Sequence, residues 1–114
     1  MRVGIIGIGM LGNAVALHLL DSGFDVTVYN RTEGKTAEVE QKGAKIAASP
    51  KIMAENVELV ITIVKDAAAV REVTFGKDGI VESKNKKLIV ADMSTIDPVE
   101  SKKISKELQQ HHIQ

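Results

Sequence analysis

A glycine-rich turn lies between a strand-like and a helix-like segment near the start of the chain. Residues 7–12 read Gly-Ile-Gly-Met-Leu-Gly, after the apolar run 3–6 and before the apolar segment 14–20, which has helical spacing. A β-rich run follows at residues 26–29. The order of strand, glycine turn, helix and strand is that of a parallel βαβ unit, so it restricts the chain to folds built from such units.

The spacing of these glycines is typical of a turn that binds a dinucleotide, because it lies between a strand and a helix. Gly7 permits the tight turn, Gly9 lets the backbone approach a pyrophosphate, and Gly12 lets the helix pack close to the strand. The unpaired N–H groups at the start of the helix would face the phosphates. The sequence therefore predicts a dinucleotide site at this turn.

The residues after the second strand-like run favour one of the two nicotinamide dinucleotides. NAD sites usually place Asp or Glu about 20 residues after the glycine turn, where it accepts a hydrogen bond from the ribose 2′-hydroxyl. Here Asn30-Arg31-Thr32 stand instead, and the guanidinium would bind a 2′-phosphate that a carboxylate would repel. Thr32 adds a hydroxyl and Lys35 a second positive charge. We expect NADP, with NAD as the second choice; the alternative is that Arg31 and Lys35 are merely solvated surface residues.

Composition limits the size of the fold and the kinds of partner. The 114 residues suffice for one domain with a buried core but not for two full domains. Lysine plus arginine number 15, as do aspartate plus glutamate, and aromatic residues make up 3%, so we expect no nucleic-acid partner and no attraction to a membrane. The absence of cysteine excludes disulfides and thiolate chemistry and suits a cytoplasmic location. Segment 3–20 contains four glycines, so we interpret it as part of the fold rather than a signal peptide or membrane span.

The three histidines predict no metal site. His18 and the pair His111-His112 have no partners at ligand spacing, and no Ser-His-Asp arrangement or P-loop is present. His18 shares a helical stripe with Leu11, Ala14 and Val15, so we expect a hydrogen-bonded, partly buried histidine.

Strand-like and helix-like segments alternate along the rest of the chain. Further strands are expected at residues 44–47, 57–64 and 88–91, the last two of the buried, parallel type. Further helices are expected at residues 33–42, 50–54, 67–74 and 98–110, with a turn at 75–79. This alternation predicts an α/β fold with a doubly wound parallel sheet, a Rossmann-type NAD(P)-binding domain.

Local signals mark where these helices begin and end. Gly43 is suited to follow a helix end, and Ser49-Pro50 and Asp97-Pro98 to cap and begin a helix. The last helix has few apolar positions, so we expect it to lie on the surface with one buried stripe, formed by Val99, Ile104 and Leu108.

With these residues placed, the sequence resembles the N-terminal domain of the β-hydroxyacid dehydrogenase family. That family includes 3-hydroxyisobutyrate dehydrogenase, tartronate semialdehyde reductase, plant-type glyoxylate reductases and 6-phosphogluconate dehydrogenase. The resemblance runs from Arg2 to the end of the chain. Its marks are the glycine turn, the Asn30-Arg31-Thr32 segment, and Asp92-Met93-Ser94-Thr95 with Pro98 close behind, which is more diagnostic than the turn.

The resemblance implies a role for each matching residue. It assigns the cofactor's pyrophosphate to Gly7, Ile8, Gly9, Met10, Leu11 and Gly12. It assigns the adenosine half of the cofactor to Asn30, Arg31, Thr32, Val64, Lys65 and Ala69. Thr95 matches a nicotinamide contact, and Ser94 matches part of the segment that holds the substrate carboxylate. Lys65 is a departure, because the family usually has proline, serine or another small residue there.

The implied activity is that of an oxidoreductase acting on a small carboxylate. A hydride would pass between NADP and a 3-hydroxy acid, a short semialdehyde or glyoxylate. The family's catalytic lysine stands in a G-x-x-G-x-G-x-x-x-K-x-x-x-N pattern, and nothing after Thr95 matches it. We therefore expect no catalytic residue in this chain, no turnover by the chain alone, and a dinucleotide-binding domain without the family's helical catalytic and dimerisation domain.

Two other interpretations stay open at this point. One is a non-catalytic NADP-binding or assembly module, which the absent lysine motivates. The other keeps the fold but changes the chemistry, toward pyrroline-carboxylate reductase or deazaflavin-dependent reductase relatives, and the Asp92–Thr95 stretch argues against it. An unpaired sheet edge with apolar surface also leaves a homodimer open.

Overall fold

The computed structural model describes residues 1–7, 10–30, 37–64, 67–83, 85, 87–93 and 98–110. Within these ranges five strands form a sheet: β1 (Arg2–Ile6), β2 (Asp25–Tyr29), β3 (Lys45–Ile46), β4 (Leu59–Thr62) and β5 (Ile89–Asp92). The helices are α1 (Met10–Asp21), α2 (Ala37–Gln41), α3 (Pro50–Asn56), α4 (Ala67–Phe75), the 3₁₀ helix η1 (Ile80–Ser83) and α5 (Pro98–Gln110).

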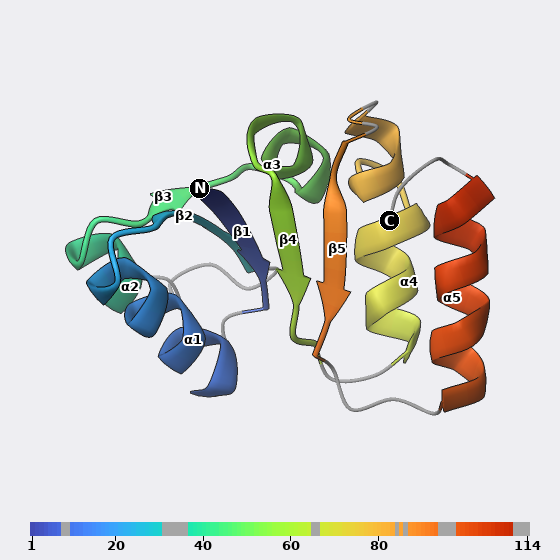
Figure 1. The fold of residues 1–114 in the computed structure, drawn as a ribbon, viewed down its shortest axis with the longest axis horizontal. Coiled ribbons are helices and arrows are strands. Elements are labelled where there is room, and N and C mark those ends of the chain that lie inside the picture. The colour runs from blue at the N-terminus through green and yellow to red at the C-terminus, as the bar shows by residue number, and fades with distance from the viewer. Residues whose placement is uncertain are drawn as a thin grey trace.

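The sheet is parallel throughout the described residues, with the order β3-β2-β1-β4-β5 (Figure 1). Strands are added outward from β1 on one side as far as β3, and the chain then crosses back to add β4 and β5 on the other side. The strand order therefore reverses between β1 and β4, which is the position where open α/β sheets bind ligands. This arrangement confirms the predicted doubly wound fold.

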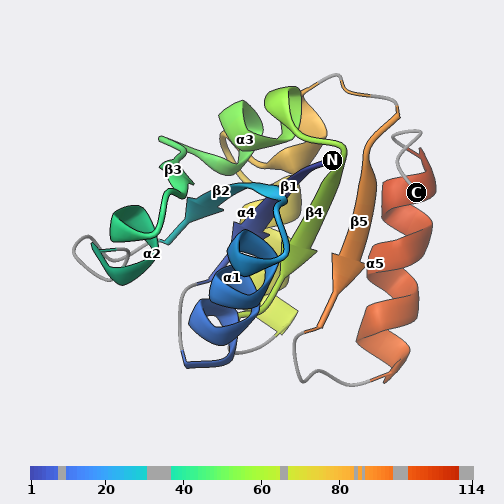
Figure 2. The same ribbon diagram turned by 60° about the vertical axis from the view of Figure 1, so that its left-hand side comes forward.

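Each face of the sheet has its own apolar core. Val3 and Ile5 of β1 pack with Ala16 of α1 and Val39 of α2 on one face. On the other face, Ile6 packs with residues of α3, α4, η1 and α5. Figure 2 shows α1 and α4 on opposite sides of the sheet. Alternate residues of β1 thus enter different cores, as the period of two in a strand requires.

The local signals for helix ends are confirmed where the structure describes them. Ser49 has extended backbone angles, and its Oγ accepts a hydrogen bond of 3.2 Å from the N–H of Ile52. Gly43, two residues after α2, has a φ of 108°, which a residue with a Cβ rarely adopts. The end of α5 at Gln110 also agrees with the prediction. The predicted cap Asp97 and the predicted helical residues 33–36 lie outside the described residues.

Three expectations about burial are wrong. Val99 is 60% exposed, so the buried stripe of α5 is reduced to Ile104 and Leu108. His18 is exposed, because α1 turns Gly12 and Ala16 toward the sheet rather than the stripe that contains His18. Residues 88–91 were expected to form a strand of the buried type, but β5 is an edge strand here, and Ile89 is 45% exposed.

One element was not expected from the sequence. The predicted turn at 75–79 is followed by η1, whose Ile80 is fully buried and whose Ser83 is nearly so. The 3₁₀ turn packs against α3 and α4, and its Ile80 lies in the same apolar core as residues of both helices. A single turn gives too short a periodic pattern to be recognised in a sequence.

The surface helix α5 is joined to α4 by an ion pair as well as by its apolar residues. Arg71 Nη1 of α4 lies 2.9 Å from Glu107 Oε1 and 3.1 Å from Glu107 Oε2. The Arg71 guanidinium also lies over the Phe75 ring, 5.9 Å from its centroid. Because both charged side chains are partly solvated, we expect this pair to contribute less to stability than the burial of Ile104 and Leu108.

Replacing Thr74 with valine is expected to stabilise the fold by about 1 kcal/mol. Thr74 in α4 is fully buried, and its hydroxyl has no hydrogen-bond partner among the described residues. Valine would keep most of the shape of the side chain and remove a polar group that has lost its contact with water. Thermal unfolding of the two proteins measures the effect. A lower melting temperature for Thr74→Val would contradict it.

Candidate functional site

Backbone hydrogen bonds hold together the carboxyl ends of four strands, β2, β1, β4 and β5, at one edge of the sheet. The N–H of Gly7 donates to the carbonyl of Tyr29, and the N–H of Ile63 donates to the carbonyl of Ile6, both at 2.9 Å. The N–H of Met93 donates to the carbonyl of Thr62, also at 2.9 Å. The backbone ladder therefore continues just beyond β1, β4 and β5 and gives this edge a fixed shape. The arrowheads of β4 and β5 mark it in Figure 1.

The predicted glycine turn has the geometry that its first and last glycines require. Gly7 has a φ of 99°, and a Cβ there would overlap the carbonyl of Ile63 and come within 3.1 Å of Val64 Cγ1. A Cβ on Gly12 would overlap the carbonyl oxygen of Gly7. Helix α1 therefore begins in direct contact with the end of β1, as the sequence predicts for these two glycines. Leu11 beside them is 52% exposed.

A small hollow of about 60 Å³ opens at the same edge. Its walls are formed by the ends of β1 and β2, by Val64 after β4, and by one face of α4. The lining residues are Ile6, Gly7, Tyr29, Asn30, Val64, Ala69, Glu72 and Val73. Four of these eight residues were assigned to cofactor binding from the sequence, namely Gly7, Asn30, Val64 and Ala69. They come from four separate stretches of the chain, and the fold brings them to one place.

Four residues of this hollow were not predicted. Ile6 and Tyr29 are the last residues of β1 and β2, and they reach the hollow because parallel strands end at the same edge. Glu72 and Val73 lie three and four positions after Ala69, on the same face of α4. Helical spacing from Ala69 could therefore have identified Glu72 and Val73 from the sequence.

The other predicted site residues are not placed by the structure. Outside the described residues lie Ile8, Gly9, Arg31, Thr32, Lys35, Lys65, Ser94 and Thr95. Met10 begins α1, but its side chain is not described. The roles assigned to all these residues stay predictions, as do the cofactor contacts of those that line the hollow.

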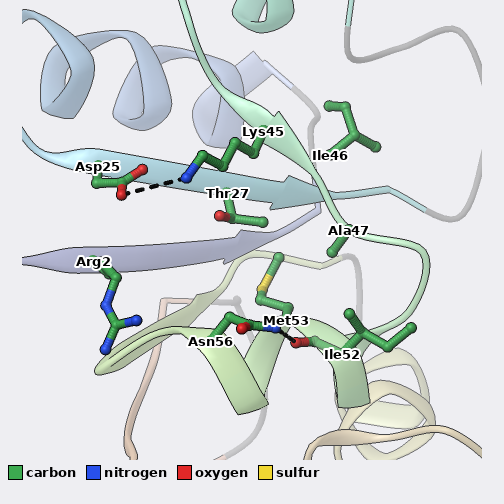
Figure 3. A pocket seen from close by; sticks show the side chains of 9 residues that line it. All are labelled: Arg2, Asp25, Thr27, Lys45, Ile46, Ala47, Ile52, Met53 and Asn56. Carbon is green, nitrogen blue, oxygen red and sulfur yellow. Dashed lines mark hydrogen bonds and ion pairs between the residues drawn. The ribbon is translucent and has the colours of Figure 1, made fainter.

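A larger hollow of about 290 Å³ lies elsewhere on the sheet (Figure 3). Arg2 and Asp25, the first residues of β1 and β2, help to line it, together with β3 and with Met53 and Asn56 of α3. Lys45 Nζ of β3 lies 3.7 Å from Asp25 Oδ2 of the neighbouring strand β2. This hollow therefore opens toward the amino ends of β1 and β2. Since open α/β sheets bind their ligands at the carboxyl ends of the strands, the smaller hollow is the better candidate for the cofactor.

Comparisons with known proteins agree with this geometry. Glyoxylate/succinic semialdehyde reductase 1 of Arabidopsis thaliana is 37% identical over 105 residues, which cover 92% of this chain and 36% of that protein. Another A. thaliana protein, named probable 3-hydroxyisobutyrate dehydrogenase-like 3, mitochondrial, is 40% identical over 97 residues, covering 85% of this chain and 30% of that protein. The solved structure of Psf3 in complex with NADP⁺ and 2-OPP matches with a TM-score of 0.91 and 26% identity, over 97% of this chain and 39% of that chain.

These matches cover only part of each relative. The chain spans about a third of the length of the two A. thaliana proteins. A family model described as the NAD binding domain of 6-phosphogluconate dehydrogenase matches residues 2–114. The chain therefore belongs to this family of NAD binding domains, in agreement with the resemblance noted in its sequence.

Proposed function

We propose that this chain is the NADP(H)-binding domain of an oxidoreductase that acts on a 3-hydroxy acid, a short semialdehyde or glyoxylate. The observation that carries the proposal is the hollow at the carboxyl edge, since Gly7, Asn30, Val64 and Ala69 all line it. A site for the adenosine half of a dinucleotide needs apolar walls for the base and a helix start beside it for the phosphates. Ile6, Val64 and Val73 supply such walls.

The preference for NADP rests on charge. Asn30 lines the hollow, and Arg31 follows it in the sequence, so we expect the Arg31 guanidinium to reach the adenosine ribose of a bound cofactor. A 2′-phosphate there would form charge-assisted hydrogen bonds with Arg31 and Thr32, with further attraction from Lys35. The complex of Psf3 with NADP⁺ supports the same choice. NAD carries a 2′-hydroxyl in place of this phosphate and would not form these interactions.

The reaction and substrate are proposed from the relatives. The name of the first A. thaliana relative specifies glyoxylate and succinic semialdehyde, and that of the second specifies 3-hydroxyisobutyrate. Ser94 would hold the substrate carboxylate and Thr95 the nicotinamide side of the cofactor. NADPH, when bound, would supply the hydride. Proton transfer would fall to a lysine in a helical domain of the kind that the family resemblance implies, and that domain would also mediate a homodimer.

The proposal also covers the location of the protein. Among the described helices, none combines the length and the apolar character needed to cross a bilayer. We propose a cytoplasmic location, with which the absence of cysteine from the chain is compatible.

A side-by-side titration of the chain with NADPH and NADH tests the cofactor assignment. We expect saturable binding of NADPH at least tenfold tighter than that of NADH, because one charge-assisted hydrogen bond contributes about 1.5–3 kcal/mol and 1.4 kcal/mol corresponds to tenfold. The full-length protein that carries this chain should then oxidise NADPH in the presence of glyoxylate or succinic semialdehyde. Equal affinity for the two cofactors would contradict the NADP preference, and no binding of either would contradict the proposed function.

A further inference from the structure

Thr62 joins the last residues of β4 and β5 through two hydrogen bonds. It is the final residue of β4 and is fully buried. Its Oγ1 donates to Oδ1 of Asp92, the final residue of β5, at 3.0 Å, and its carbonyl accepts from the N–H of Met93 at 2.9 Å. The two strands are in register at this point, with Thr62 opposite Asp92. Thr62 therefore binds both the side chain of Asp92 at the end of β5 and the backbone N–H of Met93, the residue that follows.

Within the described residues β5 pairs with β4 alone, through four residue pairs. Asp92 and Met93 are both exposed at the carboxyl edge. A hydrogen bond from a buried donor to a carboxylate is stronger than one made in water, because the donor has no competing solvent. The Thr62–Asp92 bond is thus well suited to fix the direction in which the chain leaves the strand.

The small hollow at the carboxyl edge, which we assign to the adenosine half of the cofactor and call the adenosine hollow, contains no residue of β5. Its lining residues come from β1, the end of β2 and the segments around α4. A dinucleotide that lies with its adenosine there and extends along the carboxyl edge would reach the end of β5 with its other half. The two halves of the cofactor therefore depend on different strand ends, and a change at the end of β5 should affect one half and not the other.

We infer that Thr62 and Asp92 are positioning residues for the nicotinamide half of the cofactor. Asp92 and Met93 lead directly into Ser94 and Thr95, the residues assigned from the sequence to the substrate and to the nicotinamide. Neither Thr62 nor Asp92 needs to touch the cofactor, because their bond sets where the following residues begin. This inference rests on the proposed function, since it assumes that the carboxyl edge binds NADP(H).

Titration with two ligands distinguishes a positioning role of Thr62 from a general effect on stability. Adenosine 2′,5′-bisphosphate carries the adenosine and the 2′-phosphate of NADPH but no nicotinamide. For Thr62→Val we expect the Kd of NADPH to rise about tenfold and the Kd of the bisphosphate to change less than twofold, because valine removes the hydroxyl that donates to Asp92, and Thr62 does not line the small hollow. Isothermal titration calorimetry of the wild type and the variant with both ligands, at a temperature where each is folded, measures the two ratios.

Three further variants make the result specific. Thr62→Ser keeps the hydroxyl and should restore most of the NADPH affinity. In the double variant Thr62→Val/Asp92→Ala the loss of NADPH binding free energy should be less than the sum of the two single losses, since either change breaks the Thr62–Asp92 bond. Thr74→Val makes the same substitution at another fully buried threonine, one that does not line the small hollow, and should leave both Kd values unchanged.

The outcomes distinguish the two proposals. An equal loss of affinity for both ligands in Thr62→Val would show a general destabilisation and would overturn the positioning role, as would no loss for either. If the wild-type chain bound the bisphosphate and NADPH equally well, the nicotinamide half would have no site at this edge, and the positioning role would also fail. If the wild type bound neither ligand, the proposed function would fail, and the positioning role with it.

Discussion

Exchange of Arg31 for aspartate is expected to weaken NADPH binding about 100-fold while leaving NADH binding unchanged or slightly stronger. The substitution removes a forked donor from the 2′-phosphate and introduces a carboxylate that repels it. The same carboxylate can accept a hydrogen bond from the ribose 2′-hydroxyl of NADH, as the acidic residue at this position of NAD sites does. Fluorescence or calorimetric titration of the wild type and the variant with both cofactors gives the ratio of the NADPH Kd to the NADH Kd for each protein. The change in this ratio between the two proteins measures the effect.

The charge change needs a control elsewhere on the surface. Lys102 is exposed on α5, a helix that contributes no residue to the adenosine hollow. Lys102→Asp alters the net charge by the same amount as Arg31→Asp, so any difference between them reports the local contact and not the overall field. A similar loss of NADPH affinity in both variants, or a parallel loss of NADH and NADPH affinity in Arg31→Asp, would refute the assignment of Arg31 to the 2′-phosphate.

A Gly12→Ala substitution is expected to destabilise the fold by about 3 kcal/mol, a fall of roughly 10 °C or more in melting temperature. Alanine within a helix is ordinarily about 1 kcal/mol more favourable than glycine. Here steric overlap outweighs that gain, because the new Cβ would overlap the carbonyl oxygen of Gly7. That carbonyl is backbone and cannot rotate away as a side chain could. Gly7 is itself held by its bond to Tyr29.

Gly23→Ala is the matched control for this steric argument. A Cβ on Gly23 would meet no atom within 4 Å beyond its two chain neighbours, but its φ is 89°, so alanine there carries only the cost of a left-handed backbone, about 1–2 kcal/mol. Thermal or urea unfolding of both variants should therefore rank Gly12→Ala as the less stable, although Gly12 is the glycine with ordinary helical angles. The reverse ranking would mean that α1 can move away from β1 at little cost.

Much of the fold could be predicted because its signals act over a few residues. A φ near 100° at Gly7 and Gly43, the hydroxyl cap at Ser49 and the alternation of apolar segments all depend on neighbours in the chain. The doubly wound parallel sheet was predicted from this alternation and from the βαβ unit at the glycine turn, whereas the strand order comes from the structure. For the candidate site, the structure brings Gly7, Asn30, Val64 and Ala69 to one hollow, and the first three of these follow a strand end; their contacts with a cofactor stay predictions.

The parts that escaped prediction depend on contacts between distant segments. His18 was expected on the buried stripe of its helix, but the close approach of Gly12 to Gly7 sets which face of α1 meets the sheet. The apolar sequence of β5 resembles that of β4, and only the arrangement of the sheet makes β5 an edge strand among the described residues.

The sequence by itself therefore determined the class of fold, the glycine turn and the family. The tertiary structure decided which faces are buried, brought Tyr29 and Glu72 into the hollow with Gly7 and Asn30, and paired Thr62 with Asp92, 30 residues later in the chain. The physical reason is the range of the interactions. Turns and caps are satisfied by neighbouring residues, whereas burial and cross-strand hydrogen bonds exist only once separate strands and helices have packed together.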